Sequence, residues 1–281
     1  MPPGRRDLVD SMDRNDTKLP HLFSVWPRVA SRLHRAKHIL LFLDFDGTLV
    51  GFKPRPEDVM LPAPARIVLA RLARHSRLKV FLISGRRRAD LRRRARVPGV
   101  GYIGLHGWER NGRRSLSVES RKSLRAVRSI LAGALEKLPG VWIEDKKPVF
   151  VVHYRRALAA DARKAVAITL RRVDSRRNDL YSVRGNRVVD VLPLEIEGKG
   201  QAVLDLVSDQ PRGTLVIYAG DDTTDETAFA ALAGRGITIL VGPRRKTQAR
   251  FRLRNPQELI SFLQKLQQGL ASGIVTAGRA P

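Results

Sequence analysis

The chain of 281 residues contains no cysteine. Disulfides, zinc–thiolate sites and a cysteine nucleophile are therefore excluded. No apolar run approaches the ~20 residues that a membrane-spanning helix needs. The polar stretch 1–20 also lacks the apolar core of a signal peptide. We therefore expect a soluble, cytoplasmic protein with no membrane partner, for which a monomer is the simplest assumption.

Acidic residues are scarce as well, since 27 Asp and Glu stand against 53 Lys and Arg, for a formal net charge of +26. Three interpretations are open: a surface that binds nucleic acid or an anionic membrane, a field that attracts an anionic substrate, or an arginine bias spread over a solvated surface. Arginines occur along the whole chain, without the interleaved aromatic residues that favour single-strand binding. We favour the third interpretation and do not expect a nucleic-acid partner.

Short apolar runs that end in turn signals predict strands at 39–43, 80–83, 102–105, 215–218 and 237–241. Helical patterns between them predict helices at 64–75, 86–95, 200–207 and 224–232. Continuous apolar runs are typical of strands that are covered on both faces. The alternation therefore predicts an α/β fold with a doubly wound, Rossmann-like parallel sheet.

The middle of the chain interrupts this alternation. Helices are predicted at 117–138 and 159–173, with strands at 149–153 and 187–192. We interpret this segment as a smaller α/β domain inserted between two halves of the core, and we expect a short amphipathic helix at 22–34. The predicted organisation is a disordered segment 1–20, the core 21–114, the inserted domain 115–194, the second part of the core 195–270 and a flexible tail 271–281.

The strongest chemical signal is a pair of aspartates directly after the first apolar run. Asp44 and Asp46 are spaced i, i+2, so in extended chain their side chains point the same way. Gly47 allows the chain to turn sharply there. Ligands of open α/β sheets bind at the carboxyl ends of the strands. The pair therefore predicts a ligand site, with a turn carrying two solvated acids as the alternative.

Two further segments carry weaker signals. Ser84 and Gly85 end the second predicted strand, where a hydroxyl and backbone N–H groups could bind phosphate oxygens. Lys199 stands before an apolar helical pattern, from which a cation could reach the site. Taken alone, a Ser-Gly pair is a common turn and a single lysine is usually a surface charge.

Four acids within six residues follow the strand predicted at 215–218, in the sequence Gly-Asp-Asp-Thr-Thr-Asp-Glu at 220–226. In so basic a chain, this local negative density needs a counter-charge. A hard divalent cation with oxygen ligands is the natural one, and Mg²⁺ fits because it keeps some of its waters and can bridge to a phosphate group. The alternative is an acidic helix N-terminus, which the helix dipole favours.

These four segments together resemble the four motifs of the haloacid dehalogenase-like phosphatases. The resemblance narrows to the trehalose-6-phosphate phosphatases over about 38–266. It rests on the sequence at 220–226, on Glu-Asp-Lys at 144–146 followed by Val-Val-His-Tyr-Arg at 151–155, and on Gly-Leu-His-Gly at 104–107. The C-terminal stretch around Val-Gly-Pro at 241–243 is also similar.

The resemblance implies four catalytic residues. Asp44 would be the nucleophile that becomes an aspartyl phosphate. Asp46 would protonate the leaving alkoxide and then activate water. Ser84 would bind phosphate oxygens, and Lys199 would neutralise the nucleophile and the phosphate.

The same resemblance implies Mg²⁺ as the cofactor. Asp44, the backbone carbonyl of Asp46 and Asp221 would hold the ion. Asp222 and Asp225 would support the metal ligands without contacting the ion, or would orient Lys199.

The inserted domain is implied to be a cap that closes over the substrate and excludes water. Glu144 and Lys146 would bind hydroxyls of the glucose ring remote from the phosphate, and Arg155 would order this surface or touch the sugar. Their alternatives are a solvated turn and a surface ion pair. His153 is assigned no chemistry. The residues expected to bind substrate are Gly47, Thr48, Gly85, Arg86, His106, Glu144, Lys146, Arg155 and Asp190.

Three positions depart from the family pattern. Asp190 stands where a glutamate is common, Leu192 where a cation is usual, and Gly198 where an asparagine commonly precedes the lysine. The implied function is a magnesium-dependent hydrolase of trehalose biosynthesis, which converts trehalose 6-phosphate to trehalose and phosphate. The alternatives are the same chemistry on another phosphosugar or glycosyl phosphate, and a basic nucleic-acid-binding protein that keeps the fold without turnover.

Overall fold

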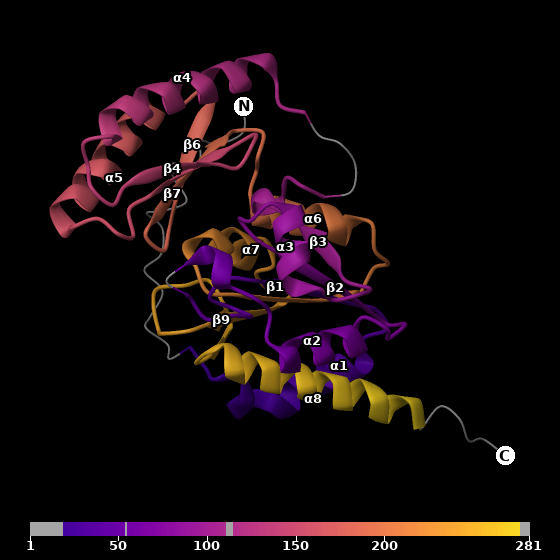
Figure 1. Cartoon of the computed structure of the whole chain (residues 1–281). Coiled ribbons are helices and arrows are strands. Elements are labelled where there is room, and N and C mark those ends of the chain that lie inside the picture. Colours follow the sequence, from indigo (N-terminus) through magenta and orange to yellow (C-terminus); the bar gives the residue numbers. More distant parts are fainter. Residues whose placement is uncertain (1–18, 54, 111–114, 276–281) are drawn as a thin grey trace.

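The computed structural model describes residues 19–53, 55–110 and 115–275. Most of the predicted lead-in, 1–18, and the end of the predicted tail, 276–281, lie outside them. A larger core domain carries a smaller domain on one side (Figure 1). No helix in the described ranges is both long and apolar enough to cross a membrane.

The core is built on a parallel six-stranded sheet with the order β10-β9-β8-β1-β2-β3. Its first strand pairs with β2 on one side and with β8 on the other, so the chain winds outward in both directions from β1. Such a switch point opens a crevice at the carboxyl ends of the strands. The strands are β1 (Ile39–Asp44), β2 (Leu78–Ile83), β3 (Gly101–Ile103), β8 (Leu215–Gly220), β9 (Ile237–Val241) and β10 (Phe251–Leu253).

Helices cover both faces of this sheet because every residue of β1 is buried and successive side chains point to opposite faces. Leu41 and Leu43 pack into one apolar cluster, whereas Leu40 and Phe42 pack into another. The helices on the first side are α1 (Trp26–Arg35), α2 (Ala63–Leu72), α3 (Arg88–Ala95) and α8 (Pro256–Val275), and those on the second are α6 (Lys199–Ser208) and α7 (Glu226–Ala231). Short 3₁₀ turns occur at η1 (Leu22–Val25), η2 (Pro56–Asp58), η3 (Leu105–Gly107) and η4 (Thr223–Asp225).

The smaller domain is an antiparallel four-stranded sheet with the order β4-β5-β7-β6. Figure 1 shows its two helices on the side of the sheet that faces away from the core, so the other face looks toward the core. Its elements are α4 (Val118–Leu135), β4 (Trp142–Asp145), β5 (Phe150–His153), α5 (Ala159–Asp174), β6 (Leu180–Gly185) and β7 (Val188–Pro193).

The predicted fold class is confirmed: a doubly wound parallel core carries a small α/β cap. Some details of the prediction are wrong. The strand predicted at 102–105 ends at Ile103, because Leu105 and His106 take left-handed conformations that no strand allows. Residues 271–275 of the predicted tail belong to α8, and β4, β6 and β10 were not predicted.

Candidate active site

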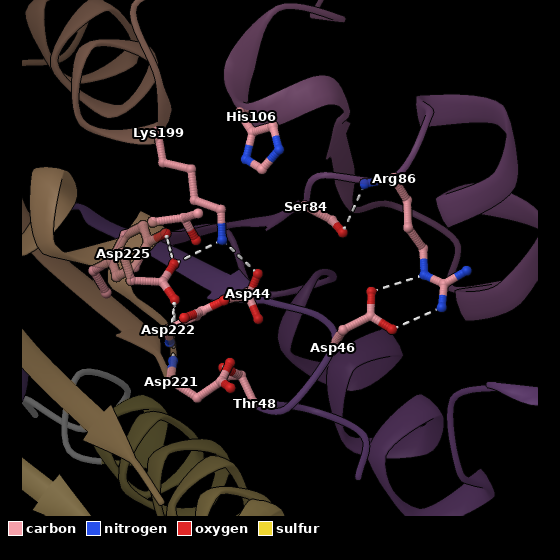
Figure 2. Close-up of polar contacts among 12 residues, drawn as sticks. Asp44, Asp46, Thr48, Ser84, Arg86, His106, Lys199, Asp221, Asp222 and Asp225 are labelled. Atoms are coloured by element: carbon pink, nitrogen blue, oxygen red, sulfur yellow. Dashed lines mark hydrogen bonds and ion pairs between the residues drawn. The ribbon is translucent and has the colours of Figure 1, made fainter. Parts of the chain in front are cut away.

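A buried ion-pair cluster occupies the carboxyl edge of the sheet (Figure 2). Lys199, the first residue of α6, donates hydrogen bonds from Nζ to Asp44 Oδ1 at 2.6 Å and to Asp225 Oδ1 at 2.8 Å. All three side chains are almost fully buried, at 6% exposed or less. Burial alone would lower the pKa of Lys199, but Asp225 and Asp44 raise it above its usual value. The lysine is therefore a permanent cation at the end of β1.

Asp225 is held from several directions. Its Oδ2 accepts the backbone N–H groups of Asp221 and Asp222, each at 3.0 Å, and its Oδ1 accepts the Tyr218 hydroxyl at 2.6 Å. Asp222 in turn accepts the Thr223 N–H and caps η4. With both oxygens of Asp225 engaged, this carboxylate orients Lys199.

Asp221 lies against the turn that follows β1. Thr48 donates from its hydroxyl to Asp221 Oδ1 at 2.9 Å. A Cβ built on Gly47, which has a φ of +90°, would lie 2.0 Å from Asp221 Oδ2. Thr48 is fully buried, and neither it nor Gly47 is among the described residues that line the cleft. These two residues shape the Asp221 site, and their contacts with the substrate stay a prediction.

The carboxylates of this edge fit a divalent cation. Oxygens of Asp44, Asp221 and Asp225 lie within 4.8 Å of one another, and the buried Oδ2 of Asp44 has no hydrogen-bond partner among the residues that the structure describes. Burial and mutual repulsion raise the pKa of Asp221 to about 9 and that of Asp44 to about 7. A buried cluster of acids with one free oxygen is a site in which a hard cation would relieve the repulsion. Because Asp225 is already engaged, Asp44 and Asp221 are the side chains free to hold it.

Asp46 points away from this cluster in Figure 2. Arg86 donates to it through two hydrogen bonds of 2.7 Å, from Nε to Oδ2 and from Nη2 to Oδ1. Arg86 also donates to Asp90 at 3.0 Å, and Asp90 accepts further bonds from Arg93 and Arg94. Although partial burial opposes it, these three arginines lower the pKa of Asp90 to about 2. The pair of Asp46 and Arg86 is therefore fixed to α3, and neither Asp90 nor this link was predicted.

The turn after β2 meets η3 at close range. Ser84 is buried, and its Oγ accepts the backbone N–H of Arg86 at 3.1 Å. A Cβ on Gly85 would lie 2.7 Å from the His106 ring, so a glycine is needed for this approach. His106 Nε2 lies 3.5 Å from Asp190 Oδ1 on β7, and neither of these buried atoms has a hydrogen-bond partner within the described residues.

Polar side chains of the cap sheet face the same cleft. Lys146 donates to the Gly85 carbonyl at 3.3 Å and lies 3.8 Å from Asp190, while Glu144 pairs with His153 at 2.8 Å. Although burial alone would raise the pKa of Asp190, Lys146 and His106 lower it. No sequence pattern pointed to His153, because a histidine inside an apolar strand is usually structural. Its pairing with Glu144 brings it into the cleft lining.

Arg155 joins the cap to the core. It donates to the Lys53 carbonyl at 2.9 Å and to the Asn186 carbonyl at 3.1 Å. The resulting cleft has a volume of about 260 Å³ and is lined by Asp44, Asp46, Ser84 and Lys199 of the core together with Glu144, Lys146 and Asp190 of the cap. The carboxylates at the core edge and the polar side chains of the cap thus line the same cleft.

Comparisons with known proteins agree with this geometry. The family model described as trehalose-phosphatase matches residues 42–257. Trehalose-phosphate phosphatases of Mycobacterium avium and Mycobacterium ulcerans are each 32% identical, over 94% and 83% of this chain and 71% and 62% of their own lengths. An uncharacterized glycosyl hydrolase of Mycobacterium tuberculosis is 32% identical over 95% of this chain but only 21% of its own. The C-terminal domain of a Candida albicans trehalose-6-phosphate phosphatase has a TM-score of 0.77 at 23% identity, covering 89% of this chain and 98% of that domain.

Proposed function

The chain belongs to the trehalose-phosphatase family, and we propose that it hydrolyses trehalose 6-phosphate to trehalose and phosphate through an aspartyl phosphate. The observation that carries the proposal is the buried contact of Lys199 with Asp44 beneath a cleft whose roof is Glu144, Lys146 and Asp190. The chain spans about a fifth of the first curated relatives and about two thirds of the named phosphatases. Cytoplasmic location and monomeric state stay predictions.

In the first step, one carboxylate oxygen of Asp44 attacks phosphorus. Lys199 donates to Oδ1 and so fixes the orientation of this carboxylate. The bond from phosphorus to the sugar oxygen breaks as the bond from Asp44 forms. Lys199 and the Ser84 hydroxyl are placed to neutralise the charge on the phosphate oxygens.

Asp46 moves the protons in both steps. It gives a proton to the departing sugar alkoxide, then takes one from the water that attacks the aspartyl phosphate. Phosphate leaves, and the Asp44 carboxylate is restored. In the structure both oxygens of Asp46 accept from Arg86, so one of them must exchange this contact for the sugar oxygen when the substrate is in place, while the other keeps Arg86 as its partner.

Magnesium fits the proposal. Asp44, Asp221 and the backbone carbonyl of Asp46 would hold the ion, and when bound it supplies charge neutralisation at the carboxylate edge. Cap closure would keep bulk water from the acyl phosphate. The contacts of Lys146 and Arg155 with core carbonyls are those of a cap lying against the core.

One observation favours a second candidate, the same chemistry on another phosphosugar. Leu192, which replaces a cation of the family pattern, is fully buried and packs with Val149 and Ile196. A group that would otherwise offer a donor to a sugar is therefore missing. Losing one such hydrogen bond changes discrimination between sugars strongly.

Phosphate release from trehalose 6-phosphate, measured beside a panel of other phosphosugars with and without Mg²⁺, tests the proposal. We expect the highest kcat/KM on trehalose 6-phosphate, and activity lost with EDTA and restored by Mg²⁺. A better substrate elsewhere in the panel would select the second candidate. Trapping a phosphoryl group on Asp44 by acid quench would test the intermediate, and a label on another residue would refute it.

A further inference from the structure

A second cavity lies beside the cleft, with a volume of about 1160 Å³. It is bounded by α3, by the segment 108–110, by the start of α4 and by the β4–β5 turn, so both domains contribute to it. Within the described chain, no residue lines both this cavity and the cleft. The two spaces are therefore distinct sites.

The lining of this cavity is strongly basic. Among the described residues, its charged members include one acid, Glu109, which already accepts the Arg88 backbone N–H and lies 3.7 Å from Arg87. The basic members are Arg88, Arg92, Arg93, Arg110, Arg121 and Lys147. So many like charges around one space attract anions strongly, since they focus a positive potential into it.

Some of these charges are compensated within the protein and some are not. Arg93 pairs with Asp90, and Arg110 pairs with Asp205. For Arg92, Arg121 and Lys147, no ion pair with an acid is found in the described ranges. These three come from α3, from α4 and from the β4–β5 turn. Cations without an ion pair in the described ranges thus approach the cavity from both domains.

The side chains that line the cavity indicate which class of anion it would bind. Arginine forks bind phosphate oxygens through two parallel hydrogen bonds, which favours phosphate groups over a diffuse anion. The cavity also has an apolar portion, formed by Trp108, Leu116 and Pro148. Its volume exceeds that of a single phosphate by a wide margin. We propose that this cavity is a binding site for a small polyphosphate anion, separate from the substrate cleft.

Two sources share this chemistry: inorganic polyphosphate and a nucleoside polyphosphate whose base would lie on the apolar portion. In either case a ligand that touches α3 and α4 at once would tie the core to the cap. Arg93 would contact the ligand directly. Arg93 donates to Asp90, which accepts from Arg86, and Arg86 in turn donates to Asp46.

Calorimetric titration of the full chain with sodium tripolyphosphate, in 0.15 M salt and EDTA, tests the proposal. The test variant is Arg92→Glu with Arg121→Glu, one exposed change in each domain. The matched control is Arg71→Glu with Arg163→Glu, exposed arginines on α2 and α5 that line neither cavity. Both variants lower the net charge equally, so the control measures the general field.

We expect saturable binding that is at least roughly tenfold weaker in the test variant than in the control, because two charge-assisted phosphate contacts become repulsive. A parallel titration with adenosine triphosphate identifies the source: tighter binding than tripolyphosphate supports a nucleotide, and equal binding supports inorganic polyphosphate. Equal weakening in both variants, or binding that does not saturate, would overturn the site. Trp108→Phe should remove any fluorescence change on binding if the ligand lies where proposed.

Discussion

The core edge and the cap face carry similar residue types in opposite settings. At the core edge, Asp44, Lys199 and Asp225 are buried and held at fixed distances by several partners. On the cap face, the Glu144 side chain is 47% exposed and has His153 as its hydrogen-bonding partner. Buried charges with fixed geometry suit a chemical step, because their electrostatic effect is strong and needs no rearrangement. The half-exposed Glu144 suits recognition, because it can exchange its partner for a sugar hydroxyl at little cost.

The largest effect should come from the core edge itself. Asp44→Asn removes the nucleophile while keeping shape and volume, so we expect kcat on trehalose 6-phosphate to fall by roughly 10⁴-fold or more. Phosphate release measures it, and a melting curve shows that the fold is kept. Turnover near that of the parent enzyme would assign the nucleophile to another residue.

The next largest effect is expected at Arg86, which connects Asp46 of the core edge to α3. Arg86→Ala frees Asp46 from its two hydrogen bonds, and we expect a loss in kcat of roughly 10²-fold, as positioned acid–base groups contribute. If Arg86 acts by positioning Asp46, kcat falls while KM changes little; if it binds phosphate directly, KM rises. Arg71→Ala, at an exposed arginine of α2 that does not line the cleft, is the control and should stay close to the parent.

A smaller effect is expected on the cap. Glu144→Gln keeps the size of the side chain but weakens a charged acceptor, so kcat/KM on trehalose 6-phosphate should fall by roughly tenfold. An aryl phosphate lacks the remote sugar ring and should be hydrolysed almost as before. Equal losses on the two substrates would mean that Glu144 does not bind the remote sugar ring.

The smallest effect is on stability. The pKa of Asp221 is raised by burial and by the charges of Asp44 and Asp225. A raised carboxyl pKa destabilises the fold once the pH exceeds its unfolded value near 4. Asp221→Asn should therefore melt a few degrees higher than the parent without metal at pH 7, and this gain should shrink as the pH falls toward 4.

Magnesium should affect the melting temperatures of the parent protein and of Asp221→Asn differently. It should raise the melting temperature of the parent protein, because an ion that binds the folded state alone stabilises it. It should leave Asp221→Asn almost unchanged. A variant that melts lower than the parent at pH 7, or one that magnesium stabilises fully, would contradict the placement of the ion.

Local pattern was enough to predict much of the core. The apolar runs before Asp44 and Ser84 are strands, since short apolar runs that end in turn signals favour buried strands of a parallel sheet. The acids at 221–225 come to the same edge because parallel strands end together. By contrast, β4 was missed because Trp142–Asp145 is short and only partly buried. The helix α8 was not predicted either, and its last residues, 271–275, were assigned to the C-terminal tail.

The sequence by itself determined the alternation of strands and helices through most of the core and the chemistry available at the carboxyl edge, because both follow from burial pattern and from residue type at the strand ends. Only the tertiary structure decided which partner each charge has. It placed Arg86 on Asp46 and His153 on Glu144, whereas the family resemblance had already implied that Asp222 or Asp225 could orient Lys199. Such pairs join residues from different elements, and their distances depend on how the layers pack, which no local pattern specifies.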